Sequence, residues 1–291
     1  MSIDERQVFM VFWDVQHGHS TYIRSPNGKH IVIDLGVGSF SNGEDFSPLA
    51  YLRNYWGVRQ LDYAIITHPH RDHIDDIQNF WLLQPRVLAR PTGITDKQIM
   101  EGVRQSEYDI FSEYCAIGRQ YNSPVEEIAD DPNNPENFGG MRIQTFFPNA
   151  QGDENFNNHS IITVVEYAGV KVVIPGDNEI SSLEKLMKGD TFKDAIKNAD
   201  ILLAPHHGRE SAYHNEFVSH VNPRLTIISD GSRGETSANQ QYSQKSRGWQ
   251  VHKKGNGTSS ERKCLTTNSD GVITAAFGYN QQQVFLNVEI E

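Results

Sequence analysis

The chain has 291 residues, 37% of them hydrophobic and 10% aromatic, which is ordinary for a soluble globular protein. Its formal net charge of −11 argues against an electrostatic grip on nucleic acid over the whole surface, although a local basic patch, bound cations or a basic partner would still admit such a substrate. With no apolar stretch of about 18 residues, no secretory signal and only two cysteines, we expect a cytoplasmic protein without a membrane span or a disulfide framework.

Apolar runs separated by turn residues predict a strand-rich first half. The expected strands cover 7–15, 20–25, 29–36, 61–67 and 86–91. The expected helices cover 47–57, with Ser47 as N-cap, and 76–85, and a polar loop covers 38–47. Residues 95–121 have the pattern of an amphipathic helix, and a loop rich in Pro, Asn and Gly follows, so we expect an insertion at about 95–140.

The second half repeats this mixture of strands and helices without a fixed-period repeat or a linker. The expected strands cover 142–148, 160–168, 170–177, 200–208, 225–231, 272–277 and 284–290. The expected helices cover 181–189 and 216–221, and residues 231–262 are expected to be polar and partly mobile. Two strand-rich halves with helices favour one domain over residues 1–291, built as a four-layer αββα sandwich.

A dense group of histidines follows the apolar run that ends at residue 66. His68, His70, Asp72 and His73 lie within six residues at an expected strand-to-helix corner, which would bring their side chains into one small volume. Imidazole and carboxylate groups together suit zinc, manganese or iron. A polar capping turn is the alternative, but the density of the group favours a metal site.

The second half supplies further candidates, and all of them lie at strand ends. Asp177 follows the run VVIPG, His206 and His207 follow ILLAP, and His159 immediately precedes the strand SIITVV. Sites on α/β frameworks form at such edges. A two-metal site needs more ligands than one histidine group provides, including a bridging carboxylate, and these residues would supply them.

These motifs resemble the metallo-β-lactamase superfamily, whose HxHxDH signature stands here at residues 68–73. Within it, the chain is similar to the hydrolase domain of the ComEC-like competence family and its stand-alone relatives. The similar segments are 11–23, 31–36, 157–177, 201–211, 227–231 and 264–273. The resemblance covers about residues 8 to 275 and implies the αββα fold and a metal-dependent hydrolase with two divalent ions, Zn or Mn.

Carried over onto this sequence, the family pattern implies that His68 and His70 hold one metal ion. Asp72 and His73 would hold the other, and Asp177 would bridge the two. One of the two histidines of the HHG segment would ligate the second ion, and its neighbour would face the substrate.

The sequence leaves the roles of His206 and His207 open. His159 stands where ComEC-like proteins often have Asn or Ser, and other superfamily members take a third ligand for the first metal from a comparable place. We therefore expect His159 to be a ligand, with a satisfied loop histidine as the alternative.

The chain departs from the family on loops that we expect to border the site. In the opening segment, Gln16 and His19 replace the Gly and Asp that the family favours. We expect His17 and His19 to support the ligands or contact the substrate, and Asp34 to be a structural carboxylate that hydrogen-bonds the ligand loop. The C-terminal third of the chain is enriched in basic residues, which either form a solvated surface or contact phosphate groups. These residues are Arg209, Lys245, Arg247, Lys253, Lys254, Arg262 and Lys263.

A bridging hydroxide on such a two-metal centre would attack phosphorus or a carbonyl carbon without a protein nucleophile. We expect Asp72, His207, His17 and His19 to be catalytic, one of the histidines supplying a proton to the leaving group. A phosphodiesterase or nuclease is favoured, with DNA, single-stranded in the first instance, as substrate. The alternatives are a hydrolase of a small ester, lactone or cyclic nucleotide, and an interaction module of a larger assembly; a separately encoded protein partner fits each of them.

Overall fold

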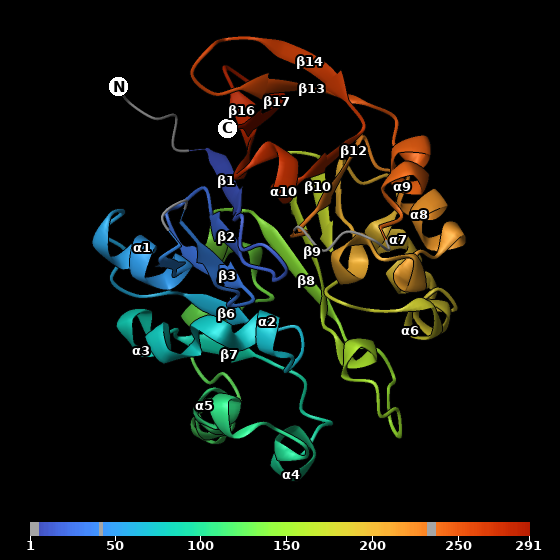
Figure 1. The fold of residues 1–291 in the computed structure, drawn as a ribbon. Helices are drawn as coiled ribbons and strands as arrows, with labels where there is room; N and C mark the ends of the chain where they lie inside the picture. Colours follow the sequence, from blue (N-terminus) through green and yellow to red (C-terminus); the bar gives the residue numbers. More distant parts are fainter. Residues whose placement is uncertain (1–5, 41–42, 232–236) are drawn as a thin grey trace.

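The computed structural model describes residues 6–40, 43–231 and 237–291, and it stacks helices, a sheet, a second sheet and further helices (Figure 1). Three separate clusters of buried apolar side chains mark the three interfaces between these four layers. The expected αββα sandwich is therefore confirmed. Among the described residues, no helix has the length and apolarity needed to cross a membrane.

The first sheet has nine strands, and most of them come from the two ends of the chain. From one edge to the other they are β14 (Ser259–Arg262), β13 (Trp249–Lys253), β17 (Gln283–Ile290), β16 (Ile273–Asn280), β1 (Gln7–Phe12), β2 (Thr21–Arg24), β3 (His30–Ile33), β6 (Tyr63–Ile65) and β7 (Val87–Ala89). A separate two-stranded ribbon, β4 (Gly38–Ser39) and β5 (Asp45–Phe46), stands within the expected polar loop at 38–47, of which residues 41 and 42 lie outside the described residues.

The second sheet has six strands from the middle and later parts of the chain. In order they are β15 (Cys264–Thr266), β12 (Leu225–Ile228), β11 (Ile201–Leu203), β10 (Val170–Ile174), β9 (Ile162–Tyr167) and β8 (Arg142–Phe146). β9 and β10 form a tight hairpin, with Ala168 and Gly169 at positive φ in its turn.

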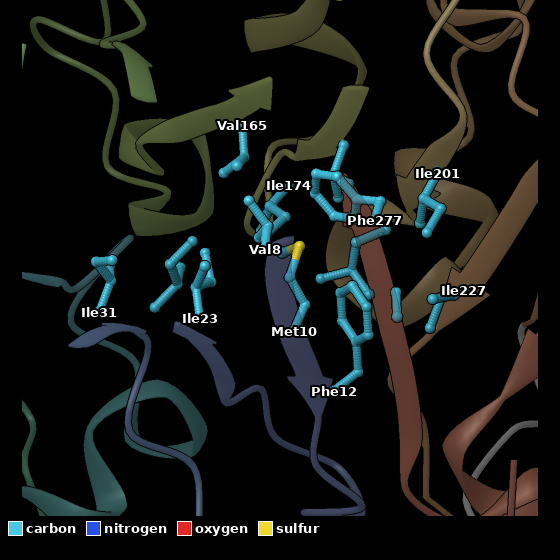
Figure 2. Close-up of a cluster of buried hydrophobic side chains, with 14 of the residues drawn as sticks. Val8, Met10, Phe12, Ile23, Ile31, Val165, Ile174, Ile201, Ile227 and Phe277 are labelled. Atoms are coloured by element: carbon cyan, nitrogen blue, oxygen red, sulfur yellow. The ribbon is translucent and has the colours of Figure 1, made fainter. Parts of the chain in front are cut away.

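The space between the sheets is filled by branched aliphatic and aromatic side chains. Val8, Met10 and Phe12 alternate along β1 and point toward Val165 and Ile174 of the second sheet (Figure 2). This alternation follows from the two-residue period of a strand, which puts every second side chain on the same face. The interleaved core fixes the distance between the two sheets and hence between the two halves of the candidate site.

Helices cover the outer face of each sheet. Over the first sheet lie α1 (Pro48–Asn54), α2 (Arg71–Ile74), α3 (Phe80–Leu83), α4 (Asp96–Met100) and α5 (Tyr108–Gln120) (Figure 1). Over the second lie α6 (Ile180–Leu186), α7 (Asp190–Ile196), α8 (Asn215–Val221) and α9 (Asn239–Lys245). α10 (Thr267–Asp270) follows β15. α1 begins as expected, because the Ser47 side chain accepts a hydrogen bond from the Ala50 N–H.

Two expectations about local structure are corrected. Residues 95–121 do not form one helix: α4 ends at Met100, Gly102 takes a left-handed φ of +73°, and α5 begins at Tyr108. Residues 237–262 are largely ordered as α9, β13 and β14, because an exposed edge hairpin needs few apolar residues. The part of this prediction that concerns 232–236 lies outside the described residues. The single-domain organisation and the insertion at about 95–140 stay predictions.

Parallel strands position the candidate site. β3, β6 and β7 run parallel in the first sheet, and β10, β11, β12 and β15 run parallel in the second. The carboxyl ends of parallel strands meet at one edge of a sheet, where ligands usually bind. Asp34 follows β3 and the histidine segment follows β6, whereas Asp177 follows β10 and the HHG segment follows β11.

Candidate metal centre

Four of the expected ligands meet as a compact group. The Nε2 atoms of His73 and His207 lie 3.4 Å apart, and each also approaches a carboxylate oxygen of Asp177, at 3.2 Å and 3.4 Å respectively. The Oδ2 atom of Asp72 lies 3.3 Å from His207 Nε2. We call Asp72, His73, His207 and Asp177 the second ligand set.

The remaining histidines of the signature adjoin this group, and the ring centroid of His68 lies 4.2 Å from that of His73. His68 Nε2 is 3.8 Å from Asp177 Oδ2 and 3.0 Å from Nδ1 of His70. We call His68, His70 and Asp177 the first ligand set. Asp177 belongs to both sets, so its carboxylate stands where a bridging ligand would stand.

The spacing of these atoms fits a metal ion. Two donor atoms at about 2.1 Å from a tetrahedral ion lie about 3.4 Å from each other. The separations in the second ligand set run from 3.2 to 3.4 Å. His68, His73 and Asp177, and likewise Asp72, His73 and His207, have one donor atom each close enough together to share an ion.

The protonation of the rings points to the same conclusion. In three of the histidines Nδ1 faces a hydrogen-bond acceptor, so in the neutral ring Nδ1 carries the proton and the lone pair of Nε2 faces the centre. The three donor–acceptor pairs are His68 Nδ1 with Thr67 Oγ1 (3.1 Å), His73 Nδ1 with Asp34 Oδ2 (2.8 Å), and His207 Nδ1 with the Ser229 carbonyl (3.0 Å). Lone pairs that face one another are stable when a cation lies between them, so the residues present fit divalent metal binding.

Asp34 hydrogen-bonds the segment that carries the first histidines, which confirms the expectation that it is a structural carboxylate. Its carboxylate accepts hydrogen bonds from the Thr67 N–H at 2.7 Å and the Thr67 hydroxyl at 2.8 Å, and from the Nδ1 atoms of His19 and His73, each at 2.8 Å. The side chain is fully buried, and its φ of +59° is a left-handed conformation that aspartate tolerates better than most residues. Asp34 therefore fixes both the orientation and the tautomer of His73.

The second half of the site is held by close backbone packing. Gly176 has a φ of +58°, and a Cβ atom at this position would lie 2.8 Å from Cβ of Ser160 and 2.9 Å from Cβ of Thr67, so only glycine fits. The Ser160 hydroxyl accepts a hydrogen bond from the Asp177 N–H at 3.0 Å, and the Gly176 carbonyl accepts one from the His206 N–H at 3.1 Å.

His206 and His207 themselves have left-handed backbones, with φ of +47° and +54°. Strain of this kind is of order 1–3 kcal/mol per residue and is found where function requires it. The two side chains consequently point in different directions from one short turn.

Electrostatics favour cations at this centre. Burial disfavours the charge on Asp177, yet His73 and His207 hold its pKa well below the usual range. Burial also opposes a charged His207, but the carboxylates of Asp177 and Asp72 raise its pKa to about 10. Burial and the nearby His73 lower the pKa of His68 well below its usual value. The field of the buried carboxylates thus stabilises positive charge beside the Nε2 atoms of the second ligand set.

The structure separates the roles of the two histidines that the sequence left open. His207 belongs to the second ligand set, whereas His206 turns its Nδ1 atom toward Oε1 of Glu179 at 3.1 Å, without the alignment of a full hydrogen bond. His206 Nε2 points back toward Asp177 Oδ2 at 3.8 Å. Sequence reasoning missed Glu179, because it stands outside any motif at the start of α6; its position two residues after Asp177 was the available signal.

One expected ligand lies away from both ligand sets. His159 ends a 3-10 turn (Phe156–His159) and donates a hydrogen bond from Nε2 to the Asp153 carbonyl at 2.9 Å, while the Phe156 ring lies against both His159 and His70. The structure therefore does not bring His159 into the first ligand set.

His19 is buried, and its ring nitrogens engage Asp34 and the Thr21 hydroxyl, each at 2.8 Å. The expectation that His19 contacts substrate is corrected, because neither nitrogen is free. His17, by contrast, lies at the centre, with its ring centroid 4.9 Å from that of His207.

Comparison with known proteins agrees with this geometry. The family model described as the metallo-beta-lactamase superfamily matches residues 13–229. The chain belongs to the metallo-β-lactamase superfamily. Members of this superfamily are typically metal-dependent hydrolases, and their fold usually binds divalent metals through clusters of His and Asp.

The resemblance to ComEC-like competence proteins is also confirmed, at low identity. ComE operon protein 3 of Bacillus subtilis is 27% identical over 244 residues, which are 78% of this chain and 28% of that protein. Competence protein ComA of Neisseria gonorrhoeae is 22% identical over 233 residues, 79% of this chain and 28% of that protein. The chain thus matches little more than a quarter of the length of these relatives.

A solved structure shares the fold. CmlA β-hydroxylase of Streptomyces venezuelae aligns with a TM-score of 0.52 at 10% identity, over 94% of this chain and 54% of that one. At this identity the likeness concerns the fold alone.

Replacing Asp34 should weaken metal binding although Asp34 touches no ion. In Asp34→Asn, the amide NH₂ group would face at least one of the N–H or O–H groups from which the carboxylate now accepts a hydrogen bond. The Nδ1 atom of His73 would then lose the acceptor that fixes its tautomer. We expect zinc affinity, measured by competition with a chromophoric chelator, to fall about 10- to 100-fold.

The matched control for this experiment is Asp62→Asn. Asp62 is a partly buried carboxylate that accepts hydrogen bonds from Lys29 and the His30 N–H away from the centre. Unchanged zinc affinity in Asp34→Asn, with the fold intact by circular dichroism, would contradict the role given to Asp34.

Proposed function

We propose that this protein is a metal-dependent phosphodiesterase, with nucleic acid, and single-stranded DNA in the first instance, as its substrate. The observation that carries the proposal is the gathering of ligands around Asp177, whose carboxylate oxygens lie 3.2 to 3.8 Å from the Nε2 atoms of His68, His73 and His207. Two-metal sites of this kind serve phosphatases and nucleases, because two cations clamp the attacking and leaving oxygens of a phosphoryl displacement. The likeness to two proteins named for competence supports the choice of substrate.

The chemistry divides between the cations and the chain. When bound, two divalent ions would act as Lewis acids and make a shared water a nucleophile at neutral pH. The Asp177 carboxylate has Oδ1 toward His73 and Oδ2 toward His68 and His207, so it would fix the position of the two ligand sets relative to each other. Neither cysteine is an activated nucleophile, because burial raises the pKa of Cys115 to about 11 and that of Cys264 to about 12.

His206 is positioned to serve the leaving group. Its side chain is about one-tenth exposed, its Nδ1 faces Glu179, and its Nε2 points back toward Asp177. Asn155 and Asn157 donate side-chain hydrogen bonds to Glu179 at 3.0 Å and 3.3 Å and so fix the carboxylate. In this proposal the leaving oxygen takes a proton from Nε2 of the doubly protonated His206 ring as its bond to phosphorus breaks, while the attacking water forms the new P–O bond and releases a proton to the solvent.

The main test is hydrolysis by the metal-loaded protein. We expect protein reconstituted with Mn²⁺ or Zn²⁺ to hydrolyse bis(p-nitrophenyl) phosphate and to cleave labelled single-stranded DNA. Asp177→Ala and His70→Ala should lower both rates by about 10³-fold or more, because each removes a ligand that holds several kcal/mol of transition-state stabilisation.

Other outcomes of the same assay select the alternatives. Loaded protein that opens a lactone, an ester or a cyclic nucleotide but leaves polynucleotides intact would favour a small-molecule hydrolase. Loaded protein inert on every substrate would favour an interaction module that acts with a separately encoded partner.

The role of His206 and Glu179 has its own test. Glu179→Gln keeps the shape of the side chain but removes the charge that orients the imidazole. General acid catalysis contributes about 10²–10⁴-fold when the leaving group is a poor one. We expect the variant to lose about 10²-fold more activity on a nucleotide, whose leaving alkoxide needs a proton, than on bis(p-nitrophenyl) phosphate, whose phenolate leaves unaided.

Glu184→Gln, on the exposed side of α6, is the control for this substitution. Equal losses on the two substrates would show that Glu179 acts on folding or metal binding and not on the leaving group.

A further inference from the structure

Arg209 places a cation beside the metal centre, and Asp230 interacts with it electrostatically. The Arg209 side chain donates a hydrogen bond from a terminal nitrogen to His17 Nε2 at 2.8 Å. Within the part of the chain that the structure describes, no carboxylate forms an ion pair with this guanidinium. An arginine has five N–H donors, so this contact leaves most of them available to a ligand.

Hydrogen bonds fix the backbone of Arg209, and the contact with His17 then orients its guanidinium. The Arg209 N–H donates to the His206 carbonyl at 3.0 Å, and the Arg209 carbonyl accepts from the Ala212 N–H at 3.1 Å. A β-bridge joins Arg209 to Ser237. Because His206 and His207 lie just before it, the same turn that aims the histidines also aims the arginine.

His17 links this arginine to the centre. Its ring is inclined by 35° to the ring of His207, with 4.9 Å between centroids. An arginine only donates hydrogen bonds, so His17 Nε2 must accept, and in the neutral ring the proton is then on Nδ1. That Nδ1 atom is buried and has no hydrogen-bond partner. His17 is thus arranged as an acceptor for Arg209, and its expected role as a proton donor to the leaving group stays a prediction.

We propose that Arg209, held in place by His17, binds a phosphate that neighbours the scissile phosphodiester, so that the preferred substrate is an oligonucleotide and not a diester with a single phosphate. This inference rests on the proposed function and narrows its substrate class. The planar guanidinium fork matches two oxygens of a phosphate, which makes arginine the usual residue for this contact.

The placement of Arg209 favours the neighbouring phosphate over the scissile one. The scissile group must lie between the two ligand sets, where the cations neutralise its oxygens. Arg209 is further from the ligand sets than His207 is, because the imidazole ring of His17 lies between its guanidinium and the His207 ring. Successive phosphates follow one another along a nucleic-acid strand, so a phosphate next to the cleaved bond can reach this outer position.

The test compares two substrates that differ in the number of phosphates. Wild type and Arg209→Gln, both metal-loaded, are assayed on bis(p-nitrophenyl) phosphate and on a labelled single-stranded oligothymidylate. A charged hydrogen bond to phosphate is worth about 1.5–3 kcal/mol. We therefore expect the loss of kcat/KM on the oligonucleotide to exceed the loss on the single diester by about 10-fold or more, chiefly through KM.

A binding measurement on the chelator-stripped protein gives a readout that does not depend on turnover. Fluorescence anisotropy with the same oligothymidylate at several salt concentrations should show that Arg209→Gln lowers the slope of log affinity against log salt by about 0.7, the value for one lost contact to a single strand. Lys97→Gln, which removes the same charge from an exposed position on α4, is the matched control and should leave selectivity between the two substrates unchanged.

The positioning role of His17 is tested with a conservative pair. His17→Gln retains an acceptor oxygen for Arg209, whereas His17→Phe retains a ring beside His207 but no acceptor. We expect His17→Phe to reproduce the selectivity loss of Arg209→Gln, His17→Gln to recover most of it, and the double variant His17→Phe/Arg209→Gln to lose no more than either single variant.

The outcomes separate this inference from the function on which it rests. A wild-type protein that hydrolyses neither substrate overturns the proposed function. A wild-type protein active on both, in which Arg209→Gln loses the same factor on each or leaves the salt slope unchanged, overturns only the assignment of Arg209.

Discussion

The site depends on one buried carboxylate that has no exposed surface of its own. Asp34 accepts four hydrogen bonds, from Thr67, His19 and His73, and so joins the end of β3 to the segment that follows β6. Burying a charge is costly unless it is fully hydrogen-bonded, and here the bonds keep the pKa of Asp34 below its usual range despite burial. The ligand histidines are thus oriented by the core of the first sheet.

The second constraint is the sandwich itself. Parallel strands in each sheet end at the same edge, and the interleaved core fixes the separation of the sheets. Glycine at position 176 lets the turn after β10 close onto Thr67, and the Ser229 hydroxyl donates a hydrogen bond to the Gly18 carbonyl across the same edge. Two ligand groups about a hundred residues apart in sequence therefore meet around Asp177, with the HHG turn presenting His207 inward and Arg209 outward.

Sequence reasoning recovered the elements whose apolar period is strong and the residues that follow them. The strands before His68, Asp177 and His206 are buried on both faces, so their ends were visible in the sequence, and the structural role of Asp34 followed from its position in the run IVIDLG. What it missed depends on tertiary packing. The side chain of His159 bonds to a local carbonyl, Glu179 has no motif, and the hairpin β13–β14 is too exposed to show an apolar period.

We propose that Asp177 is the ligand shared by two metal sites in one chain. The most direct measurement is the metal content of the chelator-stripped and reloaded protein, by elemental analysis after removal of free ions. We expect two divalent ions per chain in the wild type and no more than one in Asp177→Ala, because the shared carboxylate belongs to both ligand sets. A wild-type protein that retains no metal ion, or an Asp177→Ala variant that retains two, would contradict it.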